Sequence, residues 1–187
     1  MDNRVIFRKI KLAVCGISIF GLSSCINYAP DLQDIVPEAI KADKIHSYSV
    51  RLSVSGDEGD LLTGTLLESN KLSTAIQRSI MRSGTFSKVM DSPGAEYELT
   101  VLSDANVPGM GGDLTATVSG IWKLTRASTH QVVMEEFITA SHTATFADAF
   151  WGPSRLRIAI AGAVKGFISE GIRRLGQLNF YPAQVAE

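Results

Sequence analysis

Cysteine and histidine are scarce in this 187-residue chain, which limits the chemistry that it can carry. The cysteines are Cys15 and Cys25, and the histidines are His46, His130 and His142. The histidines lie far apart in sequence, and none stands four residues from another ligand-type side chain. Because protein zinc sites gather cysteine and histidine ligands at short spacings, we expect no metal and no other cofactor.

Familiar catalytic motifs are also missing. The sequence contains no G-x-S-x-G of a serine hydrolase, and the glycine-rich stretch 109–112 lacks the Lys-Ser/Thr of a phosphate loop. Glu135 and Glu136 are neighbours on a predicted strand, so they point to opposite faces and do not form a catalytic pair. Asp148 near His142 is a candidate acid–base couple, but such loop residues are more often ordinary surface groups. We therefore expect no enzymatic activity.

No apolar stretch is long enough to span a bilayer, which takes about 18 or more consecutive apolar residues. The run from Leu12 to Ile26 is shorter, and cysteine and serine residues interrupt it. Net charge is low as well, with 18 basic and 19 acidic residues. This balance lacks the basic footprint of a nucleic-acid-binding protein.

The N-terminus does contain a distinct signal. A basic lead with Arg4, Arg8, Lys9 and Lys11 is followed by an apolar run, 12–21, and then by Leu22-Ser23-Ser24-Cys25. This order is typical of an export signal. The final tetrad resembles the lipobox of bacterial lipoproteins. That resemblance implies that Cys25 is diacylated, that residues 1–24 are removed as a signal peptide, and that the freed amine is acylated.

Two alternatives involve Cys15. A disulfide between Cys15 and Cys25 is conceivable in an oxidising compartment, but Cys15 lies within the apolar run and would leave with the signal peptide. Cys15 is itself a poor lipidation site, because the residue before it is the β-branched Val14. We therefore expect Cys25 to be the only cysteine of the mature chain. Its lipid would attach the protein to the membrane.

Residues 25–44 are expected to be the lipidated cysteine and a flexible tether. The segment from Ile26 to about Lys44 contains two prolines and no sustained periodicity. Fully extended, its 19 or so residues reach at most about 60 Å. Ile26, rather than aspartate, follows Cys25, and by resemblance to the enterobacterial sorting rule this indicates the outer membrane.

Residues 45–187 are expected to form a single periplasmic domain. Without residues 1–24, the chain has 14 basic and 18 acidic residues. Alternation predicts strands at 45–54, 97–102, 114–125 and 132–146. The apolar, threonine-rich stretch 61–67 could extend the sheet briefly. A first helix is predicted from an N-cap at Ser69 or Asn70 to Ser83-Gly84, and a last helix from about 154 to 178. Phe86 and Val89 are expected to fold back onto the end of the first helix.

The predicted order is strand, helix, three strands, helix. Burying every apolar face then requires a two-layer α+β sandwich, with two helices on one face of a mostly antiparallel four-stranded sheet. The first two strands flank a crossover helix, so they are expected to be parallel if they are neighbours.

At this point the chain resembles small envelope lipoproteins. The resemblance rests on the lipobox, on Leu72-Ser73-Thr74-Ala75-Ile76 with the stop Gly84-Thr85-Phe86, on Gly120-Ile121-Trp122-Lys123-Leu124, and on the long final helix. The similar families are the auxiliary lipoproteins of ABC-type transport systems and, less closely, the lipoprotein that plugs the lipopolysaccharide-export barrel. The resemblance implies a non-catalytic accessory or adaptor role with an envelope protein as partner.

Two features before and within the last helix allow alternative interpretations. Phe146, Phe150 and Trp151 would contact a partner or lipid if exposed, or form a hydrophobic staple under the sheet if buried, and burial is the commoner outcome. The glycines of the helix favour tight packing on the sheet over association within a membrane. Its basic residues are expected to face water.

Three functional hypotheses follow from the sequence: an adaptor lipoprotein, a module that binds lipid or another hydrophobic ligand, and, least favoured, an enzyme. A cavity of some hundreds of Å³ between helices and sheet would indicate the second. The oligomeric state and the identity of the partner are not encoded in any pattern of the sequence.

Overall fold

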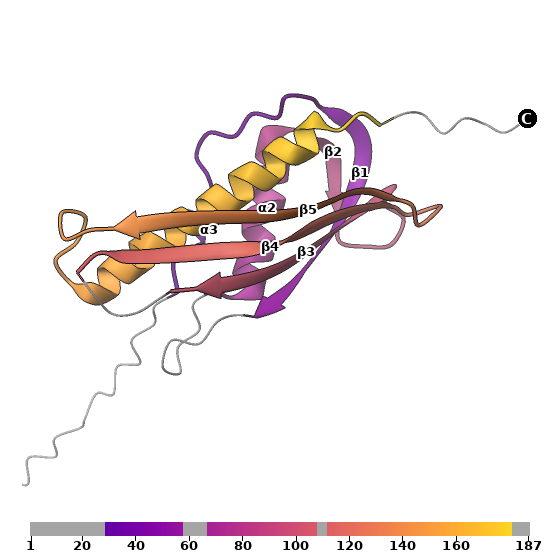
Figure 1. The fold of residues 1–187 in the computed structure, drawn as a ribbon. Coiled ribbons are helices and arrows are strands. Elements are labelled where there is room, and N and C mark those ends of the chain that lie inside the picture. The colour runs from indigo at the N-terminus through magenta and orange to yellow at the C-terminus, as the bar shows by residue number, and fades with distance from the viewer. Residues whose placement is uncertain (1–28, 58–66, 108–111, 181–187) are drawn as a thin grey trace, which may run out of the picture.

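The computed structural model describes residues 29–57, 67–107 and 112–180. These residues form a five-stranded sheet with two long helices packed on one of its faces (Figure 1). The strands are β1 (His46–Asp57), β2 (Phe86–Met90), β3 (Tyr97–Asn106), β4 (Leu114–Arg126) and β5 (Val132–Ala144). The helices are α1 (Leu32–Ile35), α2 (Ser69–Ser83) and α3 (Gly152–Gln177). The predicted α+β sandwich is thus confirmed.

The sheet has the strand order β2-β1-β3-β4-β5. β1 pairs in parallel with both β2 and β3, and β3, β4 and β5 form the antiparallel meander that the short connections predict. The sheet is therefore mixed and five-stranded, whereas four mostly antiparallel strands were expected. The additional strand, β2, has five residues and pairs with β1 at the sheet edge. A segment this short carries too little alternation to be recognised from sequence.

The core lies between the sheet and the two long helices. α3 packs on β4 and β5, while α2 packs on β1 and β2. The residues predicted to face inward from α2 are fully buried, namely Leu72, Ala75, Ile76 and Ile80. On β4 burial alternates as predicted, and the fully buried Trp122 meets Phe167 of α3 with ring centroids 5.6 Å apart. This contact fixes the position of α3 over the sheet.

The ends of α2 follow the sequence signals only in part. Gly84 adopts the left-handed conformation with φ 69° and donates its N–H to the carbonyl of Ile80, as predicted for a helix stop. The N-cap, however, is Glu68 and not Ser69 or Asn70. The Glu68 side chain makes no capping hydrogen bond and instead pairs with Lys71 at 2.9 Å. The prediction was thus wrong by one residue at this end, where a side-chain cap was assumed.

The segment before β1 is not the unpacked tether that its composition suggests. Within the described residues 29–44, Ile35 is fully buried and Ala29 and Val36 are nearly so. α1 lies against both α2 and α3, and Arg82 donates a 2.9 Å hydrogen bond to the carbonyl of Pro37. Three buried apolar side chains are enough to hold this segment on the surface formed by α2 and α3, although their spacing shows no periodicity.

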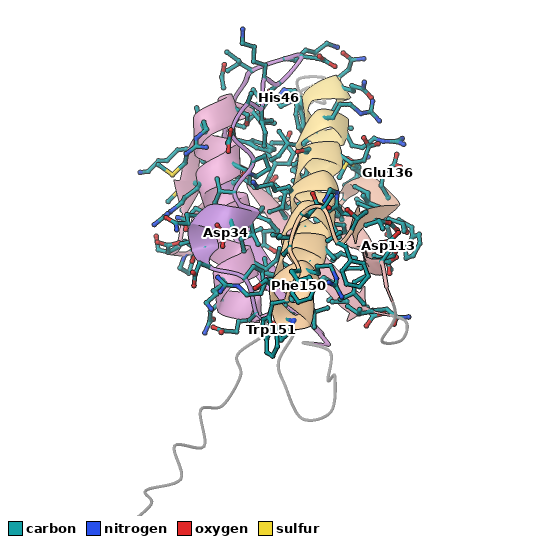
Figure 2. The ribbon with its side chains drawn as sticks, turned by 90° about the vertical axis from the view of Figure 1, so that its left-hand side faces the viewer. Asp34, His46, Asp113, Glu136, Phe150 and Trp151 are labelled. Atoms are coloured by element: carbon teal, nitrogen blue, oxygen red, sulfur yellow. The ribbon has the colours of Figure 1, made fainter. Side chains whose placement is uncertain are left out.

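The two ends of the molecule differ in character. Figure 2 shows His46 at one end and Phe150 and Trp151 at the other. His46 is buried, its Nε2–H donates to the carbonyl of Leu175 at 2.9 Å, and its ring meets Phe180 at a centroid distance of 4.2 Å. Burial lowers the pKa of His46. At this end the aromatic rings pack against one another, whereas at the other end they are exposed.

Candidate functional site

The loop between β5 and α3 exposes three aromatic side chains. Phe146, Phe150 and Trp151 are 54%, 87% and 64% exposed, respectively. The rings of Phe146 and Phe150 lie 6.4 Å apart. These residues therefore do not form the buried staple that was the commoner expectation. We call this surface, made of Phe146, Phe150 and Trp151, the aromatic end.

The loop that carries the aromatic end is held by its own polar groups. The Asp148 carboxylate accepts hydrogen bonds from the backbone N–H of Thr145 at 2.8 Å and from its hydroxyl at 2.9 Å. These bonds, the backbone one first, lower the pKa of Asp148. Asp148 is thus engaged in a turn, which accounts for its position better than an acid–base couple with His142 does.

Arg155 supports the aromatic end from beneath. Only 5% of this residue is exposed, and its guanidinium carbon lies 3.8 Å from the centroid of the Phe146 ring. Its Nη1 donates to the carbonyls of Ala149 at 3.0 Å and of Phe150 at 2.7 Å. The expectation that the basic residues of this helix face water is wrong for Arg155. The loop carbonyls and the ring attract its cation.

A second apolar surface lies on the face of the sheet opposite the helices. Leu102, Ile121 and Phe137 are direct neighbours across β3, β4 and β5. Leu102 is 45% exposed and Phe137 is 70% exposed. We call these three residues the sheet stripe. Sequence analysis missed it, although continuing the alternation of the strand at 97–102 would have placed Leu102 on the polar face.

Polar pairs surround the sheet stripe. Arg51 and Glu98 pair at 2.6 Å, and Lys123 and Glu135 pair at 3.1 Å. Hydroxyl pairs connect β4 to β5 further along, Thr115 with Thr143 and Thr117 with Ser141, each at 2.8 Å. The surface therefore combines an apolar centre with a polar surround, an arrangement typical of protein interfaces.

The candidate catalytic residues are dispersed by the fold. Glu135 pairs with Lys123 on the open face, whereas Glu136 turns to Arg174 of α3 at 3.3 Å, so the two glutamates point to opposite faces as predicted. Among the described residues no group of three or more metal-ligand side chains gathers. The stretch 109–111 and Cys25 lie outside the described residues.

A groove of about 490 Å³ runs along α3 beside α1 and the end of β5. Its lining includes Asp34, His142, Arg157 and Lys165. Arg157 is paired there with Asp31 at 3.1 Å and with Asp34 at 3.6 Å. Ile158, Ala161 and Gly162 also line it, so the groove carries both charged and apolar side chains. Because it opens between α1, α3 and the edge strand β5, it is a surface groove and not a cavity enclosed between the helices and the sheet.

The glycines of α3 lie where the helix approaches the sheet. A Cβ on Gly171 would lie 2.4 Å from the Trp122 ring, and one on Gly162 would lie 2.2 Å from the His142 ring. Tight packing on the sheet, the favoured interpretation, is thus confirmed at both positions. In the part of the chain that the structure describes, no helix is long and apolar enough to cross a membrane.

No protein-family model and no curated protein matches the sequence. Solved structures nevertheless share its fold. A Xanthomonas campestris protein of family DUF330 superposes with a TM-score of 0.58 at 15% identity, covering 80% of this chain and 95% of that one. A hypothetical protein of Chlamydia trachomatis has a TM-score of 0.53 at 11% identity, covering 71% and 97%.

A minor lipoprotein of Acinetobacter baumannii is also similar, with a TM-score of 0.49 at 12% identity, covering 74% of this chain and 99% of that one. Identities this low show a common fold and leave function open. The superpositions on the Xanthomonas and Chlamydia proteins show that the predicted α+β fold recurs in solved bacterial proteins.

Proposed function

We propose that this chain is a non-catalytic lipoprotein of the bacterial envelope, anchored through Cys25 in the outer membrane, whose periplasmic domain binds another envelope protein as an accessory or adaptor subunit. The lipobox motif supports the anchor. The fold, which recurs in small bacterial lipoproteins, supports the broader class.

The sheet stripe is the observation that carries the adaptor role. Phe137 is 70% exposed on a sheet face that no described helix covers. The stripe lies on strand surfaces and not in a cavity, so its shape suits another protein better than a small ligand. Phe137, at the β5 end of the stripe, belongs to the aromatic residues that are enriched at protein interfaces.

Photocrosslinking in cells tests this proposal. A benzoylphenylalanine at Phe137 should capture a specific envelope protein that a C-terminal tag recovers. The matched control carries the same crosslinker at Met81, which is 65% exposed on α2, in the helix layer.

The same partner should be lost when Cys25→Ser prevents anchoring. Equal capture from both positions, or capture that does not depend on Cys25, would contradict the adaptor role.

A further inference from the structure

The described chain begins at the end of the molecule that exposes the aromatic residues. Asp31 pairs with Arg157, which stands six residues after Trp151 on α3. Six residues of helix span about 9 Å. Ala29 is 4% exposed, so the chain is already seated on the domain there. Figure 2 shows Phe150 and Trp151 at the end where α3 starts, and in Figure 1 the indigo start of the described chain lies near that end of α3.

This position shortens the connection to the membrane. Cys25 stands four residues before Ala29, and four residues extend at most about 14 Å. If Cys25 carries the lipid, as proposed above, its acyl chains must enter a bilayer within that reach of the seated segment. The domain is therefore held close to the membrane surface, at the end where its aromatic rings are exposed.

We propose that Phe146, Phe150 and Trp151 insert into the bilayer interface beside the lipidated Cys25 and set the orientation of the domain. Tryptophan is enriched at the level of lipid headgroups, because its ring is apolar with one polar edge. Phenylalanine contributes buried apolar area to the same contact. The occupant of the aromatic end is thus a lipid surface and not a protein.

The loop is prepared for such a contact. Arg155 and Asp148 hold its backbone through hydrogen bonds, so little conformational freedom is lost on insertion. Asp148 already has partners in Thr145, which reduces the cost of moving it toward the headgroups. Asp113 and Asp148 are exposed near these rings, and their negative charges repel anionic headgroups. The aromatic end therefore suits a zwitterionic lipid such as phosphatidylethanolamine.

Insertion at this end gives the domain a defined direction. α3 starts at the aromatic end and runs for 26 residues, about 39 Å, toward the end that holds His46. The sheet stripe lies on the opposite side of the sheet from α3. It remains accessible to a partner while the aromatic end faces lipid.

Quenching of Trp151 tests the insertion directly. The lipidated full-length protein is reconstituted into phosphatidylethanolamine vesicles, with a minor share of phosphatidylglycerol, whose acyl chains carry bromine close to the headgroup. Part of the tryptophan emission should be lost, and this loss should vanish in Trp151→Phe. Trp122 is fully buried in the core, so its emission should not respond.

Lipid photocrosslinking provides a second measurement. A phospholipid with a diazirine in its acyl chain should label residues 146–151 in the reconstituted protein. The label should disappear when Phe146, Phe150 and Trp151 are all changed to serine. Ile45→Ser is the matched control, since Ile45 is a 74% exposed apolar side chain beside His46 at the other end of the molecule, and this change should leave the labelling unchanged.

The outcomes separate this proposal from the proposed function. Absence of quenching and labelling in a protein that is acylated at Cys25 and floats with the vesicles would overturn the insertion alone. Crosslinks from the aromatic end to a second copy or to another protein would overturn it as well. An intact mass without acyl groups would overturn both proposals, because the insertion depends on the anchor.

Discussion

Gly171 shows how a single absent methyl group sets the distance between the two layers. The Trp122 ring occupies the space into which a Cβ at this position would project, at 2.4 Å. Trp122 is fully buried and rigidly packed against Phe167, so the ring has little room to move. Glycine is about 1 kcal/mol less favourable than alanine in a helix. It is nevertheless found here because a side chain at this position would clash with the Trp122 ring.

Gly171→Ala is expected to lower the free energy of unfolding. Overpacking costs about 1–3 kcal/mol, while alanine in place of glycine returns about 1 kcal/mol of helix propensity. Gly166→Ala is the control, since its Cβ would lie 3.1 Å from the Ala140 methyl, where a small shift suffices.

Urea unfolding of both variants should place Gly171→Ala below Gly166→Ala. A Gly171→Ala protein as stable as the wild type would show that the Trp122 ring can move.

The segment before β1 acts as part of the domain at the level of the element. It has no long helix or strand, yet it closes the outer surface of the helix layer through α1 and through Arg157, which bridges Asp31 and Asp34. Exposed ion pairs of this kind contribute little, about 0–1 kcal/mol. The burial of Ile35 therefore holds the segment in place.

Ile35→Ala is expected to destabilise the protein by about 2–5 kcal/mol, the range for truncating a fully buried isoleucine. Ile45→Ala is a matched control, because Ile45 is 74% exposed and its truncation should cost less than about 0.5 kcal/mol. Thermal unfolding of the two variants compares them. Equal transition temperatures would mean that the segment behaves as the free tether that its sequence suggested.

At the scale of the whole molecule, the described residues present two apolar surfaces, the aromatic end and the sheet stripe, and the segment that leads to the lipidation motif starts beside the first of them. The aromatic end lies beside the start of the described chain, and the sheet stripe lies on the face away from α3. In our proposals the first meets lipid and the second meets a protein. Both depend on acylation at Cys25.

Cys25→Ser is expected to abolish palmitate labelling and signal cleavage, because no thiol remains to accept the lipid. Cys15→Ser should be labelled and cleaved normally, since Cys15 would leave with residues 1–24. Metabolic labelling followed by immunoprecipitation compares the two. Persistent label in Cys25→Ser would refute the lipobox interpretation.

The amino-acid sequence by itself determined the local structure. Alternation on β4, periodicity on α2 and α3, and the glycine stop at Gly84 are set by residues close together in the chain, so they were predictable. The lipobox motif is equally local, and acylation at Cys25 stays a prediction. The short strand β2 escaped, because its pairing with β1 depends on a distant segment.

Only the tertiary structure decided which apolar residues are exposed. Phe146, Phe150 and Trp151 look like a buried staple in the sequence, but in the structure the buried Arg155 packs on the Phe146 ring and binds the loop carbonyls, and the three rings stay exposed. Leu102 and Phe137 become one surface only through strand register. The seating of residues 29–44, likewise, follows from a surface formed by α2 and α3 together. Exposure depends on contacts between distant segments, and such contacts are not a property of any local pattern.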